Sequence, residues 1–199
     1  MSVHISSSGV LVVGLSPDEV VVLRTMIDMV CRVCNDPAFG EPVHAPSDDA
    51  SPEDLLAQLE RAWTDVPDSE ATPRDAAARR LFPDACPTDQ AVSHDFRRLT
   101  LADQRLAKIM AADVVRAGLD RADARGRIRV ERTEQTSWLT TITAIRIVLA
   151  ARLGIDRDED EDRLDDLDDT DPTYWMYNVY LWLAWLQESV VECLMRVAD

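Results

Sequence analysis

Hydrophobic residues recur at helical spacing over most of this chain. The first such stretch opens at Ser16, which is followed by Pro17 and Glu19, so an N-cap, a first-turn proline and a capping box coincide. This helix is expected to end near Asn35. The same spacing predicts helices at residues 51–63, 73–81, 133–154 and 172–195, and a longer one that starts at Thr88 or Ser93 and ends near Gly118.

Two regions have the alternating pattern of short strands. Residues 3–5 and 10–13 flank a turn-rich cluster and predict a hairpin, and residues 127–132 alternate arginine with Ile128 and Val130. We therefore expect a mainly α protein, with about five or six helices packed around a small antiparallel sheet made of the N-terminal hairpin and one short strand. Residues 1–199 are expected to form a single domain, with a proline-rich loop at 36–50 and an acidic linker at 156–171 between the last two helices.

The acidic linker changes how the net charge of −16 is interpreted, because the sixteen residues 156–171 hold eleven carboxylates and only two arginines. Its spacing fails the calcium-loop pattern, since Glu161 stands where a glycine is needed and Leu167 where a glutamate is needed. Such a run is most often a solvated linker. The alternative is electrostatic docking of a basic partner through Asp158, Glu159, Asp160, Glu161 and Asp162.

The middle of the chain is mildly basic, with thirteen basic and nine acidic residues between positions 72 and 132. A solvated helix surface explains most of this excess, and a nucleic-acid face is the competing interpretation. An acidic chain gains little from the counterion release that drives DNA binding, so protein partners are favoured and direct DNA contact stays open. The candidate nucleic-acid face consists of Arg97, Arg98, Arg105, Lys108, Arg127 and Arg129.

Cys31 and Cys34 form the most distinctive local motif, at the end of the first long helix. Two thiols at this spacing can form a disulfide where the end of a helix frays. A thioredoxin-type pair instead opens a helix, where the dipole favours the thiolate, so a disulfide-exchange enzyme is not expected. Two interpretations stay open: a regulatory thiol pair, or two small apolar residues packed near a helix face.

Catalysis is not predicted, because the motifs of serine hydrolases, nucleotide-binding loops and zinc proteases are absent from the sequence. Cys86 and His94 lack a second closely spaced pair, so no metal site and no cofactor are expected. The start of the chain has no signal-peptide pattern, and polar residues interrupt its most apolar stretch, 174–195, so we expect a cytoplasmic protein without a membrane span. Three tryptophans of the last helix, Trp175, Trp182 and Trp185, suit a core or, as we expect, a homodimer surface.

Four stretches of the later two-thirds carry a family resemblance. They are Arg80-Leu81-Phe82-Pro83-Asp84-Ala85, Asp95-Phe96-Arg97-Arg98-Leu99-Thr100, the segment 146–154, and Trp182-Leu183-Ala184-Trp185-Leu186-Gln187-Glu188-Ser189. Together they resemble an actinobacterial family of oxidative-stress regulators, formerly a domain of unknown function, which is encoded near the Clp protease adaptor and cysteine-biosynthesis genes.

The resemblance implies a redox-responsive transcriptional regulator whose sensing pair is Cys31 and Cys34. Both cysteines lie outside the four matching stretches. Such a regulator would act through protein contacts, among which the transcription machinery is a candidate, and direct DNA contact stays open. The alternative is a non-catalytic adaptor or structural partner protein without DNA binding.

Overall fold

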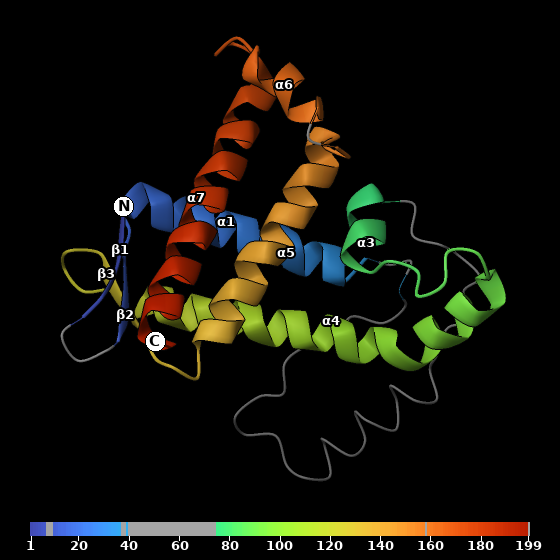
Figure 1. Cartoon of the computed structure of the whole chain (residues 1–199), viewed down its shortest axis with the longest axis horizontal. Helices are drawn as coiled ribbons and strands as arrows, with labels where there is room; N and C mark the ends of the chain where they lie inside the picture. Colours follow the sequence, from blue (N-terminus) through green and yellow to red (C-terminus); the bar gives the residue numbers. More distant parts are fainter. Residues whose placement is uncertain (7–9, 37–38, 40–74, 158, 199) are drawn as a thin grey trace.

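The computed structural model describes residues 1–6, 10–36, 39, 75–157 and 159–198. Within these ranges it contains six helices and a three-stranded antiparallel sheet (Figure 1). The predicted fold class, mainly α with a small sheet, is confirmed. The expected helix at 51–63, most of the expected loop at 36–50, and Asp158 lie outside the described residues.

The sheet is built from β1 (Ser2–Ile5), β2 (Leu11–Gly14) and β3 (Arg127–Val130), with β2 in the centre. Both pairings are antiparallel, and Leu11 lies opposite Ile5 on one side and Val130 on the other. Along β3 the isoleucine and valine are buried and the two arginines are exposed, as the alternation of the sequence predicted. One face of the sheet therefore adds to the core.

Gly126 joins the sheet to the start of the first helix. The Leu15 amide donates to the Gly126 carbonyl at 2.9 Å, so the turn before β3 lies against the entry to that helix. Gly126 has a φ of +71°, and a Cβ atom at this position would lie 2.0 Å from the Leu15 carbonyl oxygen. Only glycine fits here, because both the left-handed backbone and the close approach exclude a side chain.

The helices form one packed body around α5. Their bounds are α1 (Pro17–Cys34), α3 (Ala76–Leu81), α4 (Gln90–Asp120), α5 (Gln135–Leu153), α6 (Glu159–Asp165) and α7 (Pro172–Ala198). In Figure 1, α5 and α7 run side by side across α1 and α4, with the sheet at one end. Trp138, Ile142, Ile145 and Leu149 of α5 are fully buried, and each of the three aliphatic side chains contributes about 1.5–3 kcal/mol of hydrophobic free energy. None of the described helices combines the length and apolar character that crossing a membrane requires.

The predicted helix ends agree with the structure to within a few residues. Ser16 caps α1 with the expected capping box, and Gly154 ends α5 with a φ of +70°. Asp89 caps α4, so this helix begins between the two predicted starts. Asp75 caps α3, which therefore begins later than position 73.

Candidate functional site

Cys31 and Cys34 lie on the last turn of α1, as the sequence predicted. Cys34 has an exposed fraction of 0%, and Cys31 is half-buried. Both are free thiols, as are Cys86 and Cys193. The pair therefore lies at the edge of the hydrophobic core and not on an open surface, which sets its chemistry.

Burial raises the pKa of both thiols. Loss of solvation is the largest effect on Cys34 and raises its pKa from 9.0 to about 12. It also raises the pKa of Cys31, although the positive charge of Arg116 opposes the rise. Because the thiolate is the nucleophile, the raised pKa of each thiol disfavours its reactive form at neutral pH.

Arg105 of α4 closes the C-terminal end of α1. This side chain has an exposed fraction of only 3%. Its Nε donates to the Cys34 carbonyl at 2.6 Å, its Nη1 donates to the Phe39 carbonyl at 3.0 Å, and its Nη2 lies 3.4 Å from the Asn35 side-chain oxygen. The last carbonyls of a helix have no partner within the helix, so the guanidinium does the work of a C-terminal cap.

Arg116, also from α4, contacts the same end of α1 beside the first thiol. Its Nη2 donates to Asp28 at 2.6 Å and lies 3.5 Å from the Cys31 sulfur, while its Nη1 donates to Asp113 at 2.6 Å. Partial burial opposes the charge of Arg116, but these contacts outweigh it and raise the pKa of the guanidinium. A permanent positive charge therefore lies next to the Cys31 sulfur, which makes this thiolate the easier of the two to form.

The regular helix keeps the two sulfurs from bonding to each other. Residues at this spacing on a helix have Cβ atoms about 5–6 Å apart, whereas a disulfide needs about 3.5–4.5 Å. Hydrogen bonds from the Asn35 amide to the Cys31 carbonyl (3.1 Å) and from the Asp36 amide to the Val33 carbonyl (3.2 Å) hold the last turn. A Cys31–Cys34 disulfide therefore requires this turn to move, which displaces the Cys34 carbonyl that Arg105 binds.

The six basic residues predicted to form a nucleic-acid face do not share one surface. Arg105 is buried, so its assignment to an exposed face is corrected. Arg98 is exposed on the first part of α4, whereas Arg129 is exposed on β3, which follows the far end of that helix (Figure 1). The helix between Arg98 and Asp120 alone spans about 33 Å at 1.5 Å per residue, so these cations are far apart.

The remaining basic candidates are partly occupied by internal contacts. Arg97 forms an ion pair with Asp84. Arg127 forms one with Asp123 at 2.7 Å, and its hydrogen bonds lower the pKa of that carboxyl to about 2. Lys108 is half-buried with its ammonium group over an aromatic ring. The two ion pairs offset part of the positive charge that the region presents to a phosphate backbone.

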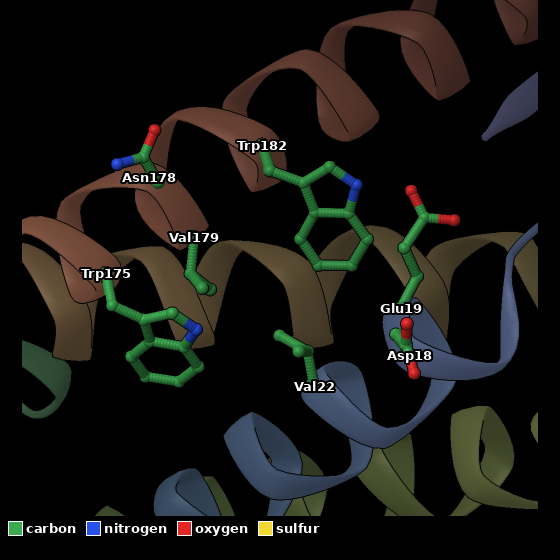
Figure 2. A pocket seen from close by; sticks show the side chains of 7 residues that line it. All are labelled: Asp18, Glu19, Val22, Trp175, Asn178, Val179 and Trp182. Atoms are coloured by element: carbon green, nitrogen blue, oxygen red, sulfur yellow. The ribbon is translucent and has the colours of Figure 1, made fainter. Parts of the chain in front are cut away.

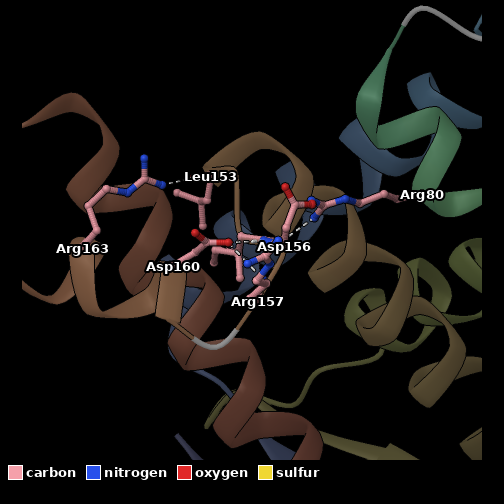
Figure 3. A network of polar contacts seen from close by, with 7 residues as sticks. Arg80, Leu153, Asp156, Arg157, Asp160 and Arg163 are labelled. Carbon is pink, nitrogen blue, oxygen red and sulfur yellow. Dashed lines mark hydrogen bonds and ion pairs between the residues drawn. The ribbon is translucent and has the colours of Figure 1, made fainter.

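The acidic stretch 156–171 is more ordered than the solvated linker that the sequence led us to expect. It contains α6, and Figure 3 shows how the start of this helix is held. Arg80 forms an ion pair with Asp156, the Asp160 carboxylate accepts from the amides of Asp156 and Arg157 at 2.8 and 3.0 Å, and Arg163 donates to the last carbonyl of α5 at 3.3 Å. Arginines and backbone amides thus offset the repulsion between the carboxylates.

Two tyrosines of α7 form hydrogen bonds with carboxylates of α6. The Tyr177 hydroxyl donates to Asp165 at 2.6 Å, and the Tyr180 hydroxyl donates to Glu161 at 3.1 Å. Burial, together with the nearby Asp165 carboxylate, raises the pKa of Tyr177, so its phenol stays a proton donor. Of the predicted docking residues that the structure describes, Asp160 and Glu161 are used internally, and Glu159 and Asp162 are exposed.

A groove between the start of α1 and the first half of α7 was not predicted. Its volume is about 210 Å³, and Figure 2 shows the side chains that line it. The sequence marked its tryptophans only as a core or dimer surface and its acidic residues only as part of a helix start. The groove exists because α1 and α7 both pack against α5, a tertiary arrangement with no local signal. Its lining residues are Asp18, Glu19, Val22, Trp175, Asn178, Val179 and Trp182.

The considered zinc ligands Cys86 and His94 have other neighbours. The Cys86 sulfur lies 3.6 Å from the Thr88 hydroxyl, and the His94 imidazole lies 3.8 Å from Asp95. Within the described ranges, no group of three or more histidine, cysteine, aspartate or glutamate side chains is placed to hold a metal ion. The thiol pair and the groove are therefore the two sites to interpret.

Comparison with known proteins identifies the family. The family model described as "Domain of unknown function (DUF2017)" matches residues 2–194. The chain belongs to this family. The matched residues of this DUF2017 chain include the thiol pair, Arg105 and Arg116 beside it, and the residues that line the groove. No curated protein and no solved structure matches the DUF2017 chain.

Proposed function

We propose that the protein is a redox-responsive transcriptional regulator of the oxidative-stress response, which senses oxidants through Cys31 and Cys34 and acts through protein contacts. The observation that carries the proposal is the contact between Arg105 and the Cys34 carbonyl at 2.6 Å. It links the state of the thiol pair to the packing of α1 against α4. The resemblance of residues 80–85, 95–100 and 182–189 to oxidative-stress regulators supports the same function.

The sensing reaction consumes one peroxide molecule. The Cys31 thiolate, favoured by Arg116, attacks a peroxide oxygen, and the O–O bond breaks to leave a sulfenic acid and one water once the departing hydroxide has taken a proton. The Cys34 sulfur then attacks the sulfenic sulfur, and hydroxide leaves with the Cys34 proton as a second water. Two thiols are oxidised to one disulfide, and the peroxide is reduced to water.

Because the pKa of both thiols is raised, the pair responds only to a high or sustained concentration of oxidant. At neutral pH little thiolate is present, so brief or weak exposure to peroxide leaves the pair reduced. Sustained oxidant, or opening of the last turn of α1, allows the reaction to proceed. Once the disulfide forms, the altered turn changes the surface that the end of α1 and the adjoining part of α4 offer to a partner.

Protein contacts are favoured over direct DNA contacts by the placement of the basic residues. Arg105 is buried, and Arg98 and Arg129 lie on different elements. The same observation favours the second candidate, an adaptor without DNA binding. A titration of labelled duplex DNA at low salt separates the two: binding that weakens steeply with salt supports a DNA-binding regulator, and no binding leaves protein contacts alone.

Peptide mapping after peroxide treatment tests the sensing pair. The expected result is the joint loss of the Cys31 and Cys34 thiols and the appearance of one peptide in which they are linked. In a Cys34→Ser variant, a sulfenic-acid reagent is expected to label Cys31. Cys193→Ser is the matched control, because this buried cysteine lies on α7 and its loss leaves the linkage unchanged. If Cys31 and Cys34 both stay free in peroxide-treated protein, the proposed function is wrong.

A further inference from the structure

We propose that the exposed side of α7 pairs in antiparallel fashion with α7 of a second copy of the chain, so that the protein forms a two-fold symmetric homodimer. The sensing reaction is assigned to Cys31 and Cys34 of α1, whereas the pairing surface lies on α7 alone. The proposal therefore goes beyond the proposed function and does not depend on it.

One continuous stripe of exposed residues runs along the outward side of α7. The buried side of this helix packs against α5 and β1. On the opposite side, exposed residues recur at alternating steps of four and three, which is the spacing of the seam along which two helices pair. We call this set the α7 stripe; its members are Tyr174, Asn178, Leu181, Trp185, Glu188, Glu192 and Met195.

The first half of the α7 stripe is apolar and free of charge. Tyr174, Leu181 and Trp185 have exposed fractions of 38%, 40% and 46%. No charged residue occurs in α7 between positions 172 and 187, although 29% of the whole chain is charged. Trp175 and Trp182 do not belong to the stripe, because they turn toward α1 and line the groove (Figure 2). Large apolar side chains gathered on an uncharged surface are typical of a protein–protein interface.

The second half of the α7 stripe decides the direction of the pairing. Glu188 and Glu192 are exposed, and a parallel pair would place each of them against the same glutamate of the second copy. Like charges opposed in this way disfavour the parallel arrangement. An antiparallel pair with its two-fold axis between Leu181 and Trp185 instead packs Trp185 of one copy on Leu181 of the other. It also keeps the glutamates of the two copies apart.

The same antiparallel register matches hydrogen-bond acceptors with donors. Counted outward from the axis, Glu188 lies opposite Asn178 of the second copy, and Glu192 lies opposite Tyr174. The Asn178 side-chain nitrogen donates to the Tyr174 carbonyl at 2.8 Å, and its second hydrogen can donate to a carboxylate. The Tyr174 hydroxyl can do the same. The α7 stripe is thus complementary to itself when reversed, which is the requirement for a two-fold symmetric interface and favours a second copy as the occupant.

The area of the α7 stripe sets the expected strength of the dimer. Its exposed side-chain surface is about 500 Å² per copy, or about 1,000 Å² for the pair. This area is close to the lower limit for a specific interface, so we expect a Kd on the order of 10 µM. Two chains of net charge −16 also repel each other, and salt screens this repulsion.

Sedimentation of the reduced protein from about 1 to about 300 µM tests the dimer, because association rises with concentration by mass action. The mass should increase from 22.3 kDa toward twice that value. Raising the salt concentration from about 0.05 to about 0.5 M should lower the Kd. A mass that stays at 22.3 kDa at every concentration overturns the proposal and leaves the stripe to a different protein. A Kd that rises with salt also overturns it, because opposite charges would then hold the copies together.

Trp185→Glu tests whether the α7 stripe forms the interface. This variant should remain monomeric, because a two-fold interface loses each contact twice. Leu99→Glu is the matched control, since Leu99 is 74% exposed on α4 and lies outside the stripe. The control should dimerise like the unaltered protein, and circular dichroism should show that both variants keep their helices. Equal Kd values for the two variants would overturn the proposal.

Asn178→Arg tests the antiparallel register. The new arginine meets Glu188 of the second copy twice in an antiparallel dimer, so the Kd should fall about fivefold. In a parallel dimer it meets the same arginine of the second copy, and the Kd should rise. Gln90→Arg, at the exposed start of α4, is the control for the change in net charge. The proposal is wrong if Asn178→Arg weakens the dimer or strengthens it no more than Gln90→Arg does. These measurements leave the sensing reaction untested, so the two proposals can fail separately.

Discussion

The two ends of α1 are stabilised in opposite ways. At its start, Ser16 and Glu19 cap the helix with their own side chains, only three residues apart. At its end, Cys34 depends on Arg105, which lies 71 positions away in the sequence. The first end is exposed and the second is buried. The start of α1 is held by contacts within its own first turn. The end of α1 is held by a side chain of α4, so its conformation can be coupled to the rest of the fold.

The charged side chains also differ between the two ends of α1. Asp18 and Glu19 lie at the positive end of the helix dipole, and Arg105 and Arg116 contact its negative end, so both placements are favourable. The thiols at the negative end gain no such help, because the dipole disfavours a thiolate there. The dipole therefore acts in the same direction as burial and keeps the pair protonated.

The largest expected contrast is in the protonation of Cys34. Its pKa is raised from 9.0 to about 12, so at pH 7–9 the folded protein should hold on the order of 10³ less thiolate at this position than the unfolded chain. The raised pKa favours the protonated thiol, so the free energy of unfolding should fall as pH rises from 9.0 toward 12. The Cβ resonance of isotope-labelled Cys34 measures this directly. Titration near pH 9 in the folded protein would show that burial does not control the thiol.

Arg105→Met should cause the largest loss of stability at the C-terminal end of α1. It leaves the buried Cys34 and Phe39 carbonyls without their donor, at a cost of about 2–4 kcal/mol in the free energy of unfolding. Denaturant unfolding measures the change, and Arg98→Met is the matched control on the exposed surface of α4, with an effect within about 0.5 kcal/mol. Equal effects of the two variants would remove Arg105 from the account.

Ser16→Ala should lower the free energy of unfolding by about 1 kcal/mol through loss of the capping box. It should leave the rate of peroxide oxidation of Cys31 and Cys34 unchanged, because the capping contacts at the start of α1 do not reach its end. Thr136→Ala, an exposed change in the first turn of α5, is the control for stability. Faster oxidation in the Ser16 variant would mean that the whole helix opens together and that its two ends are not independent.

Arg116→Met should have the smallest effect on stability, below about 1 kcal/mol, because its ion pairs with Asp28 and Asp113 are partly exposed. Its effect should appear in the chemistry, where the loss of the positive charge beside Cys31 slows the reaction of that thiol with peroxide. Sulfenic-acid trapping in a Cys34→Ser background measures the rate. An unchanged rate would show that Arg116 is structural only.

The start of α1 could be predicted from the sequence because its determinants are local. The capping signal at residues 16–19, the glycine stop at Gly154 and the alternation in β3 each involve neighbouring residues, and each is found in the structure. The position of Cys31 and Cys34 at a helix end followed from the same local pattern.

The environment of the site could not be predicted, because distant residues create it. Arg105 looked like one more exposed cation in a basic region, and only the packing of α4 on α1 shows it to be buried. The order of α6 depends on Arg80 and on tyrosines of α7, which outweigh the charge pattern that suggested a solvated linker. The groove likewise needs residues from α1 and α7 together.

Amide hydrogen exchange in the reduced and the peroxide-oxidised protein tests the central claim, that oxidation of the thiol pair opens the last turn of α1. In the reduced protein the amides of Asn35 and Asp36 are hydrogen-bonded to the carbonyls of that turn, and the amide of Glu19 is bonded in the capping box. After oxidation, we expect faster exchange at Asn35 and Asp36 and unchanged exchange at Glu19. A Cys31–Cys34 disulfide that forms while Asn35 and Asp36 keep their protection would contradict it.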